Sequence, residues 1–277
     1  MREISINELK ELQVEMLDAI HAYCISNKIN YTLAAGTLLG AIRHKGYIPW
    51  DEDIDIAMPR PDYMKFIKGF NSLNSDYYVI SPELNWDYYA PYANVCDRRT
   101  ILYEGANGHR GMEIGIKIDV FPIDGLPSDE TEFNLELRKI HQINDILSSK
   151  RHVLHKIPLR YYKTILRLLK IRMKTFAKSY SAYQKELNSI ARRTDYGSTP
   201  FVNAWVFSII NCRLDINIFR KYIDVDFEGK KYMACEGYDV WLKALYGDYM
   251  QLPPEEERIP HHGFTAYWKN GFGPEDR

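Results

Sequence analysis

Two segments of this sequence contain runs in which apolar and charged residues alternate, as in a strand with one face in a protein core. In the first, DEDIDIAM, the apolar residues Ile54, Ile56 and Met58 share one parity. Asp53 and Asp55 share the other. Because successive side chains of a strand point to opposite faces, the apolar set can enter the core while both carboxylates stay together on the other face. The segment therefore predicts a strand that carries a carboxylate pair.

The second segment, IGIKIDVFPID, repeats the alternation. Four apolar residues between Ile114 and Val120 alternate with Lys117 and Asp119. The pattern predicts another strand, with a third carboxylate on the face opposite the core and a lysine two residues before it. Asp124, near the end of the segment, is predicted to cap a turn.

Three carboxylates on adjacent strands indicate a metal site. Like charges held close together repel, and a bound divalent cation relieves the repulsion. Asp53, Asp55 and Asp119 would bind two Mg²⁺, or one Mg²⁺ beside a general base. Either arrangement serves in-line displacement at phosphorus, because metal ions offset charge on the attacking and leaving oxygens. The alternative for the DxD pair alone is a solvated acidic turn. Asp51 shares the parity of the pair and is assigned a supporting position behind the ligands.

A strand-to-helix turn at Gly36 and Thr37 precedes the acidic strand. An apolar strand over 31–35 leads into the short helix TLLGAIRHK, and backbone N–H groups at a helix N-terminus attract phosphate. Gly36 permits close approach, and the Thr37 hydroxyl can hydrogen-bond an oxygen. Arg43 and His44, at the end of this helix, could reach a diphosphate. The alternative is an ordinary capping turn, followed by cations that merely suit the helix dipole.

The order of these patterns predicts an α/β (α+β) fold. Strand-like and helical segments alternate up to about Asp124, and helical periodicity prevails from about 128 to 194. We expect a catalytic core over residues 1–127, a mainly helical region over 128–236, and a C-terminal helix and tail over 237–277. A chain of 277 residues is long enough for one large domain with a substantial subdomain.

Composition excludes several classes of protein. The formal net charge of -1 argues against a nucleic-acid binder, which usually carries a basic excess. The four cysteines form no CxxC pair, which argues against a cysteine-built zinc site, and their scatter fits reduced thiols in a cytoplasm. No run approaches the roughly 20 apolar residues that a membrane span needs. We therefore expect a cytoplasmic protein that is soluble or peripheral to a membrane.

One stretch has a strong local charge. No acidic residue lies between Asp145 and Glu186, whereas eleven of the 36 Lys and Arg residues do. Apolar residues recur there at helical spacing from Leu159 to Phe176. A basic amphipathic helix of this kind suits an anionic membrane surface, where each basic residue contributes roughly 1 kcal/mol. We predict a membrane-facing stretch over about 150–185; packing on the acidic remainder of the chain is the alternative.

The run GTLLGAIRHKGYIPWDEDIDIAM, together with KIDVFPIDGLP and the tail LPPEEERIPHH…AYWK, resembles the signature of LicD-type phosphotransferases, which are related to the fukutin group. The resemblance implies a nucleotidyltransferase-like mixed sheet flanked by helices, with the tail returning to the active site. Family members typically move phosphocholine from CDP-choline to a sugar hydroxyl of a surface glycan and release CMP; others use CDP-ribitol. The clustered cysteines of the animal relatives' zinc motif are missing, so no structural zinc is expected.

The resemblance also implies roles for individual residues. Gly36 and Thr37 match the family's turn, Asp53 and Asp55 its metal ligands, and Asp119 its third carboxylate. Mg²⁺, or Mn²⁺ in its place, would grip the donor diphosphate while Asp119 orients or deprotonates the acceptor hydroxyl. The acceptor would be a glycan or teichoic acid precursor, which a lipid anchor would hold at the inner face of the membrane.

Four further residues are candidates for donor binding. Arg43 or Lys117 would neutralise charge that develops at the phosphate. Trp50 would contribute to an aromatic cage for a quaternary ammonium, and His262 in the tail would contact phosphate or metal. Trp86, Tyr88, Tyr89 and Tyr92 form a second aromatic cluster, for most of which core packing or surface scatter is the better expectation.

Two other functions share these residues. A nucleotidyltransferase that adds NMP to a small acceptor would need the same carboxylates and differ only in which phosphorus is attacked. A membrane-peripheral scaffold on a decayed transferase fold would need none of them, and the intact carboxylate set speaks against it.

Overall fold

A mixed sheet with one parallel pair of strands near its centre organises the fold. The computed structural model describes residues 1–73, 75–104, 113–152, 154, 157–206, 212–259 and 264–273. Strands β2 (Thr32–Leu33), β3 (Asp55–Pro59), β7 (Lys117–Gly125), β5 (Ala93–Asp97) and β4 (Tyr77–Ile80) lie side by side in that order. The β3–β7 pair is parallel and the neighbouring pairs are antiparallel. The predicted α/β class with a mixed sheet is confirmed.

Shorter strands extend this framework. Strands β8 (Phe201–Asn203) and β9 (Leu214–Asp215) continue the sheet from the end of β7. A separate sheet joins β1 (Glu3–Ile4), β12 (Phe264–Trp268) and β6 (Thr100–Glu104), so the two ends of the chain pair with each other. The hairpin of β10 (Tyr222–Phe227) and β11 (Lys230–Cys235) packs beside β2 and the helix that follows it.

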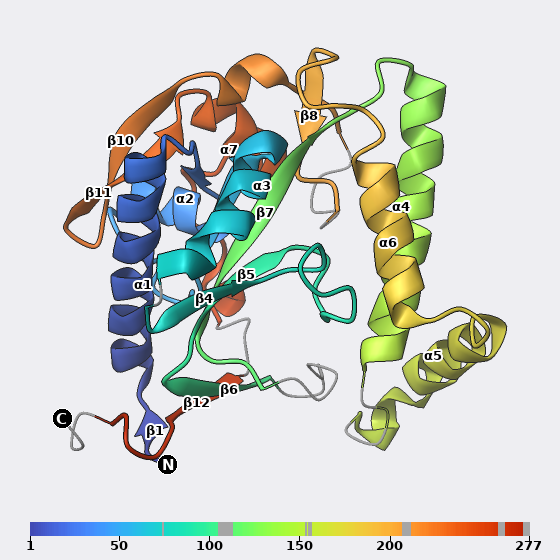
Figure 1. The fold of residues 1–277 in the computed structure, drawn as a ribbon, viewed down its shortest axis with the longest axis horizontal. Coiled ribbons are helices and arrows are strands. Elements are labelled where there is room, and N and C mark those ends of the chain that lie inside the picture. The colour runs from blue at the N-terminus through green and yellow to red at the C-terminus, as the bar shows by residue number, and fades with distance from the viewer. Residues whose placement is uncertain are drawn as a thin grey trace.

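Helices flank the sheet in two groups (Figure 1). The first group is α1 (Ile6–Asn27), α2 (Ala35–Arg43), α3 (Arg60–Gly69) and α7 (Tyr238–Tyr246), with the 3₁₀ turns η1 (Phe70–Leu73), η4 (Ile216–Phe219) and η5 (Glu255–Glu257). The second is α4 (Glu130–Arg151), α5 (Tyr162–Lys174) and α6 (Tyr180–Ala191), with η3 (Leu159–Tyr161). Helices therefore fill much of 130–191, whereas 201–235 carries strands.

Helix ends follow local capping chemistry. Ser5 begins α1 by accepting a hydrogen bond from the backbone N–H of Glu8, and Asp129 does the same for Glu132 at the start of α4. Lys28 ends α1 in the left-handed conformation, with φ of 53°. None of the helices in the described part of the chain is long and apolar enough to cross a membrane.

The buried apolar residues form two separate cores. The larger combines residues from Ile4 to Ile123 with residues from Val202 to Trp268, so the C-terminal quarter folds back onto the N-terminal half. The smaller lies between α4 and α6, where Phe133 stacks on Trp205 at 6.1 Å between ring centroids.

A buried polar network joins the two groups of helices. Arg60 at the start of α3 donates to both carboxylate oxygens of Asp124, at 2.6 and 2.8 Å, and to Glu83 at 2.9 Å. Asn188 of α6 donates to the same Glu83 at 2.7 Å. The prediction that Asp124 caps a turn is wrong: it lies within β7, is 1% exposed, and forms an ion pair with an arginine 64 residues away.

This ion pair generates a prediction about stability. Arg60→Met would leave Asp124 buried without its cation, and we expect the free energy of unfolding to fall by about 3 kcal/mol or more. Urea denaturation would measure the change. Lys243→Met removes the exposed pair with Asp239 on α7 and serves as the control, with an expected loss below about 1 kcal/mol. Equal losses in both variants would contradict a special role for the Arg60 network.

Candidate active site

The parallel pairing of β3 with β7 places two predicted carboxylates side by side. Asp55 lies opposite Asp119 in the register, and the backbone N–H of Asp119 donates to the carbonyl of Ile54 at 3.1 Å. Asp55 begins its strand, while Asp53 lies in the extended segment just before it. The predicted alternation holds for the apolar set, since Ile54, Ile56 and Met58 are fully buried.

Asp53, Asp119 and Asp51 all act on Asp55. Burial raises the pKa of Asp55 well above its usual value, and the negative charges of Asp53, Asp119 and Asp51 raise it further. Lys117 opposes these effects only in part. The cluster therefore carries an excess of negative charge, which a cation would offset. Asp51, which sequence reasoning placed behind the metal ligands, belongs to this charged group.

The donor chemistry of the cluster fits a hard divalent cation. Carboxylate oxygens are the ligands that Mg²⁺ prefers, and Mg²⁺ usually takes one or two of them together with substrate phosphates rather than a full protein cage. Among the described residues, no three His, Cys, Asp or Glu side chains are arranged as a ready ligand set. A site of this kind would be completed by a phosphate-bearing substrate.

Asp119 is held by polar contacts from two sides. Lys117 forms an ion pair with its Oδ1 at 2.8 Å, and the side-chain amide of Asn94 donates to the same oxygen. Asn94 is itself oriented by the hydroxyls of Tyr88 and Tyr89, which donate to its Oδ1. Of the second aromatic cluster, Tyr88 and Tyr89 are thus buried, as expected, but they also position the partner of Asp119.

The Gly36–Thr37 segment positions the acidic strand. Helix α2 begins at Ala35, slightly earlier than predicted, so both residues lie in its first turn. The Thr37 side chain is 3% exposed, and its Oγ1 accepts a hydrogen bond from the backbone N–H of Asp55 at 2.8 Å. A Cβ at Gly36 would lie 2.3 Å from Oδ2 of Asp51, so only glycine lets this carboxylate approach the helix. Ala35 has a φ of 44°, an uncommon conformation for a residue with a side chain.

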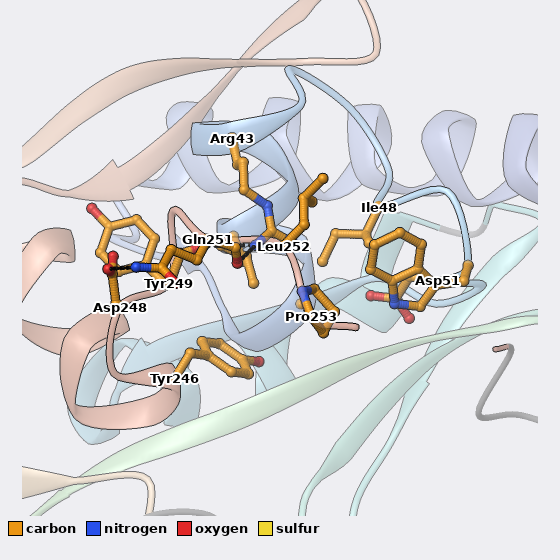
Figure 2. Close-up of a pocket in the computed structure, with 12 residues that line it drawn as sticks. Arg43, Ile48, Asp51, Tyr246, Asp248, Tyr249, Gln251, Leu252 and Pro253 are labelled. Carbon is orange, nitrogen blue, oxygen red and sulfur yellow. Dashed lines mark hydrogen bonds between the residues drawn. The ribbon is translucent and has the colours of Figure 1, made fainter. Parts of the chain in front are cut away.

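A pocket of about 420 Å³ adjoins the carboxylates. Gly36, Arg43, Trp50 and Asp51 line it from the N-terminal half, and residues 246–253 line it from the C-terminal segment. Figure 2 shows Arg43 reaching from α2 toward Gln251 and Leu252, with Tyr246 across the space from it. Segments about 200 residues apart in sequence therefore build one cavity.

Arg43 holds the C-terminal segment in place at this pocket. Its Nη1 donates to the carbonyls of Tyr249 and Gln251, at 2.6 and 3.0 Å, and so fastens the C-terminal segment over the pocket. His44 lies next to Arg43 Nε, and its ring meets Trp50 edge-on at 6.5 Å. Burial, and then the charge of Arg43, lower the pKa of His44, so its imidazole is neutral near pH 7. Within the described residues His44 supports the pocket wall and does not line the cavity.

Tyr246, in the last turn of α7, was missed by sequence reasoning. Burial raises the pKa of its hydroxyl, and Asp55, Asp51 and Asp53 raise it further while Arg43 lowers it. Tyr246 thus lines the pocket and is subject to the charge of the carboxylates. The local sequence DVWLKALYG shows only helical periodicity. The residue is therefore identified only by its position in the folded chain.

The remaining candidates lie in different places. Trp50 forms a wall of the pocket, with the Arg258 guanidinium 5.9 Å from its ring centroid. Tyr47, three residues before Trp50, packs on Phe227 and donates to Gln13 at 2.9 Å, so it packs against the core. His262 lies outside the described residues.

Comparisons with known proteins point to one family. The family model of the LicD/FKTN/FKRP nucleotidyltransferase domain matches residues 28–159, which include Gly36, Asp53, Asp55 and Asp119. Over 285 aligned residues the chain is 31% identical to the lipopolysaccharide cholinephosphotransferase LicD of Haemophilus influenzae, covering 96% of this chain and 99% of that protein.

Shorter similarities extend to uncharacterized proteins of two rickettsiae. One, from Rickettsia typhi, is 33% identical over 92 residues and covers 30% of each chain. The other, from Rickettsia prowazekii, is 42% identical over 48 residues, or 17% of this chain and 18% of that protein.

The Thr37 contact generates a prediction that is independent of any substrate. Thr37→Val keeps the shape of the side chain but leaves the backbone N–H of Asp55 without its acceptor, at an expected cost of about 1–3 kcal/mol of unfolding free energy. Thr37→Ser retains the hydroxyl and should remain closer to the native protein in urea denaturation. If valine were no more destabilising than serine, the hydroxyl would not be what holds the strand.

Proposed function

Because the chain belongs to the LicD family of nucleotidyltransferase-domain proteins, we propose that it is a phosphotransferase that uses a CDP-activated donor. It would transfer phosphocholine, or a related phospho-alcohol, to a sugar hydroxyl of a cell-surface glycan and release CMP. The glycan would be lipopolysaccharide or a teichoic acid precursor. The observation that carries the proposal is the carboxylate cluster of Asp51, Asp53, Asp55 and Asp119 beside a substrate-sized pocket. The similarity that runs nearly the full length of both chains supports choline as the first alcohol to test.

The pocket beside the carboxylates is proposed to take the donor. Its volume of about 420 Å³ lies within the range of ligand pockets, roughly 300–1,000 Å³. Trp50 offers an aromatic face, and Asp51 offers a negative charge that suits a quaternary ammonium. Gly36, Thr37, Arg43 and Lys117 remain our candidates for phosphate contacts, although Thr37, Arg43 and Lys117 also have the structural partners described above.

The carboxylates would have two roles: to bind the metal ion and to orient or deprotonate the acceptor hydroxyl. Asp53 and Asp55 would hold Mg²⁺, or Mn²⁺ in its place, with Asp119 as the third ligand or as the base. The ion supplies charge neutralisation at the diphosphate and at the developing transition state. Asp119, held by Asn94 and Lys117, is positioned to orient the acceptor hydroxyl or to take its proton.

The bonds that change are those of an in-line phosphoryl transfer. The acceptor hydroxyl oxygen forms a bond to the phosphorus that carries the choline. The bond from that phosphorus to the bridging oxygen of the diphosphate breaks, and its electron pair leaves with CMP. The hydroxyl proton passes to a carboxylate, for which Asp119 is the candidate.

A donor panel tests the proposal. The protein is incubated with CDP-choline, CDP-ribitol, CDP-glycerol or CTP, each with de-acylated lipopolysaccharide as acceptor, with and without Mg²⁺, and the nucleotide products are separated. We expect CMP from one CDP-alcohol, and only when metal is present. Pyrophosphate from CTP would instead identify a nucleotidyltransferase, and no binding of any donor in calorimetry would favour a non-catalytic scaffold.

Replacement of the carboxylates tests the metal assignment. Asp53→Asn and Asp55→Asn should each lower turnover by about two orders of magnitude or more, because the ion that offsets phosphate charge is lost. Circular dichroism should show an unchanged fold. Asp226→Asn, a surface carboxylate on β10 paired with Lys231, is the matched control and should keep wild-type turnover. Wild-type rates in both site variants would rule out these ligands.

We also propose that the protein acts at the cytoplasmic, inner face of the cell membrane, where a lipid-linked acceptor would reside. Helix α5 buries one residue, Leu168, among those described. Apolar side chains project from it and its flanks between basic residues: Leu159 is 85% exposed, Phe176 82%, Met173 68% and Leu166 60%. Arg167 and Lys178 have acidic partners on α4 and α6. Figure 1 shows α5 at the lower right, at the edge of the second helical group and on the side away from α1.

Vesicle flotation tests this placement. We expect binding to vesicles that contain anionic lipid, weak binding to neutral ones, and release as salt concentration rises. Leu166→Glu combined with Met173→Glu should lower binding to anionic vesicles at least about tenfold by removing apolar insertion. Leu135→Glu, an exposed leucine on α4, is the control. Equally weak flotation with both lipid compositions would contradict the membrane role.

A further inference from the structure

A second, smaller pocket lies on the Asp119 side of the carboxylates. It has a volume of about 220 Å³ and is lined by Tyr89 and Tyr92 from the segment before β5 and by Asn144, Ser148 and Arg151 from the last two turns of α4. Neither the acidic strand nor the proposed donor pocket contributes to its lining. The two cavities are therefore built by different parts of the fold.

A chain of hydrogen bonds connects this pocket to the catalytic carboxylates. Tyr89, which lines the pocket, donates to Asn94 Oδ1 at 3.5 Å, and the amide of Asn94 donates to Asp119. Tyr92 also lines the pocket, and burial and then the charge of Asp119 raise the pKa of its hydroxyl. Two hydrogen bonds, through Tyr89 and Asn94, thus link the wall of the pocket to Asp119, the carboxylate proposed to handle the acceptor hydroxyl.

The aromatic wall of the pocket is rigid. Gln184 of α6 donates to the carbonyls of Tyr88 and Ala90, each at 2.9 Å, and the hydroxyl of Tyr180 donates to the carbonyl of Tyr89. Tyr92 packs on Phe121 of β7 at 4.6 Å between ring centroids. Two side chains of α6 thus fix a short loop through three hydrogen bonds to its backbone carbonyls. Fixed walls are typical of a preformed binding site.

Polar groups of α4 face this wall. Asn144 donates to the carbonyl of Val206 at 3.0 Å, which orients the amide. Arg151 lies 5.7 Å from the ring centroid of Tyr89, and its buried Nε has no hydrogen-bond partner among the described residues. A buried guanidinium N–H without an acceptor carries a desolvation cost, which an anionic or hydroxyl oxygen of a ligand would relieve.

We propose that this pocket binds the acceptor, and specifically a sugar ring of an anionic glycan, with its reactive hydroxyl directed toward Asp119. The aromatic rings suit the apolar face of a pyranose, while Asn144, Ser148 and Arg151 suit its hydroxyls and an anionic substituent. A volume below the roughly 300–1,000 Å³ typical of pockets for larger ligands fits one sugar ring rather than a nucleoside diphosphate. The inference rests on the proposed transferase function and assigns the side from which the acceptor enters.

The position of the pocket also fits a membrane-bound acceptor. Arg151 ends α4, and α5 is fastened to this end of the helix. Arg172 donates to the carbonyls of Ser149 and His152, and Lys150 donates to the carbonyl of Thr175 at 2.8 Å. The helix proposed to lie on the membrane therefore adjoins the helix end that lines the acceptor pocket.

The test separates acceptor binding from donor binding. In Arg151→Gln we expect the KM for de-acylated lipopolysaccharide to rise at least about tenfold, the change expected from loss of a charge-assisted hydrogen bond. The dissociation constant for CDP-choline, measured by calorimetry, should stay within about twofold of wild type. Ser148→Phe, which fills the pocket from another position, should give the same split. Arg138→Gln, on the exposed side of α4, is the matched control.

Two results would overturn the inference. One is an acceptor KM that is unchanged in both pocket variants; the other is a donor affinity that falls as much as acceptor affinity does. Saturation-transfer NMR with the same oligosaccharide needs no turnover. If the wild type transfers nothing but binds the oligosaccharide in an Arg151-dependent way, the pocket assignment stands and the proposed reaction fails. If the wild-type protein does not bind the oligosaccharide, the pocket assignment fails.

Discussion

The parallel pairing of β3 with β7 is the constraint on which the site depends. It places Asp55 beside Asp119 across two strands that are 64 residues apart, and it does so in a partly buried environment where their charges repel. A fold that only needed stability would gain by replacing one of them. The surrounding contacts instead maintain the arrangement, because Thr37 holds the backbone of Asp55 and Asn94 holds the side chain of Asp119. A concentration of charge that is supported in this way is typical of a functional site.

The C-terminal segment completes the site from a distance. Arg43 fastens residues 249–251 above the pocket, and α7 brings Tyr246 to the edge of the carboxylates. The two ends of the chain also pair in one sheet, β1 with β12. Similarity to LicD of Haemophilus influenzae likewise extends over nearly the whole chain, beyond residue 159, where the domain model ends.

The helical group is coupled to the sheet through buried polar contacts rather than through a shared apolar core. The Arg60, Asp124 and Glu83 network reaches α6 at Asn188, and Gln184 of the same helix fixes the loop before β5. Helix α6 thus sets the position of Tyr89, and α4 supplies the facing side chains. In the proposed reaction this arrangement separates the two substrates, with the donor on the Asp51 side and the acceptor on the Asp119 side, while α5 remains exposed at the periphery.

The sequence by itself determined the elements whose pattern is local. A period of two identified the strands that contain Asp55 and Asp119 and their buried faces, and the long motif around Asp53 identified the family. Only the tertiary structure decided the rest. Asp124 forms an ion pair instead of a turn cap, and Thr37 accepts a hydrogen bond from a backbone N–H. Tyr246 lines the pocket beside the carboxylates, and Arg151 lines the smaller pocket. The reason is physical: alternation reports which face a side chain takes, whereas convergence depends on strand pairing and helix packing between residues far apart in the chain.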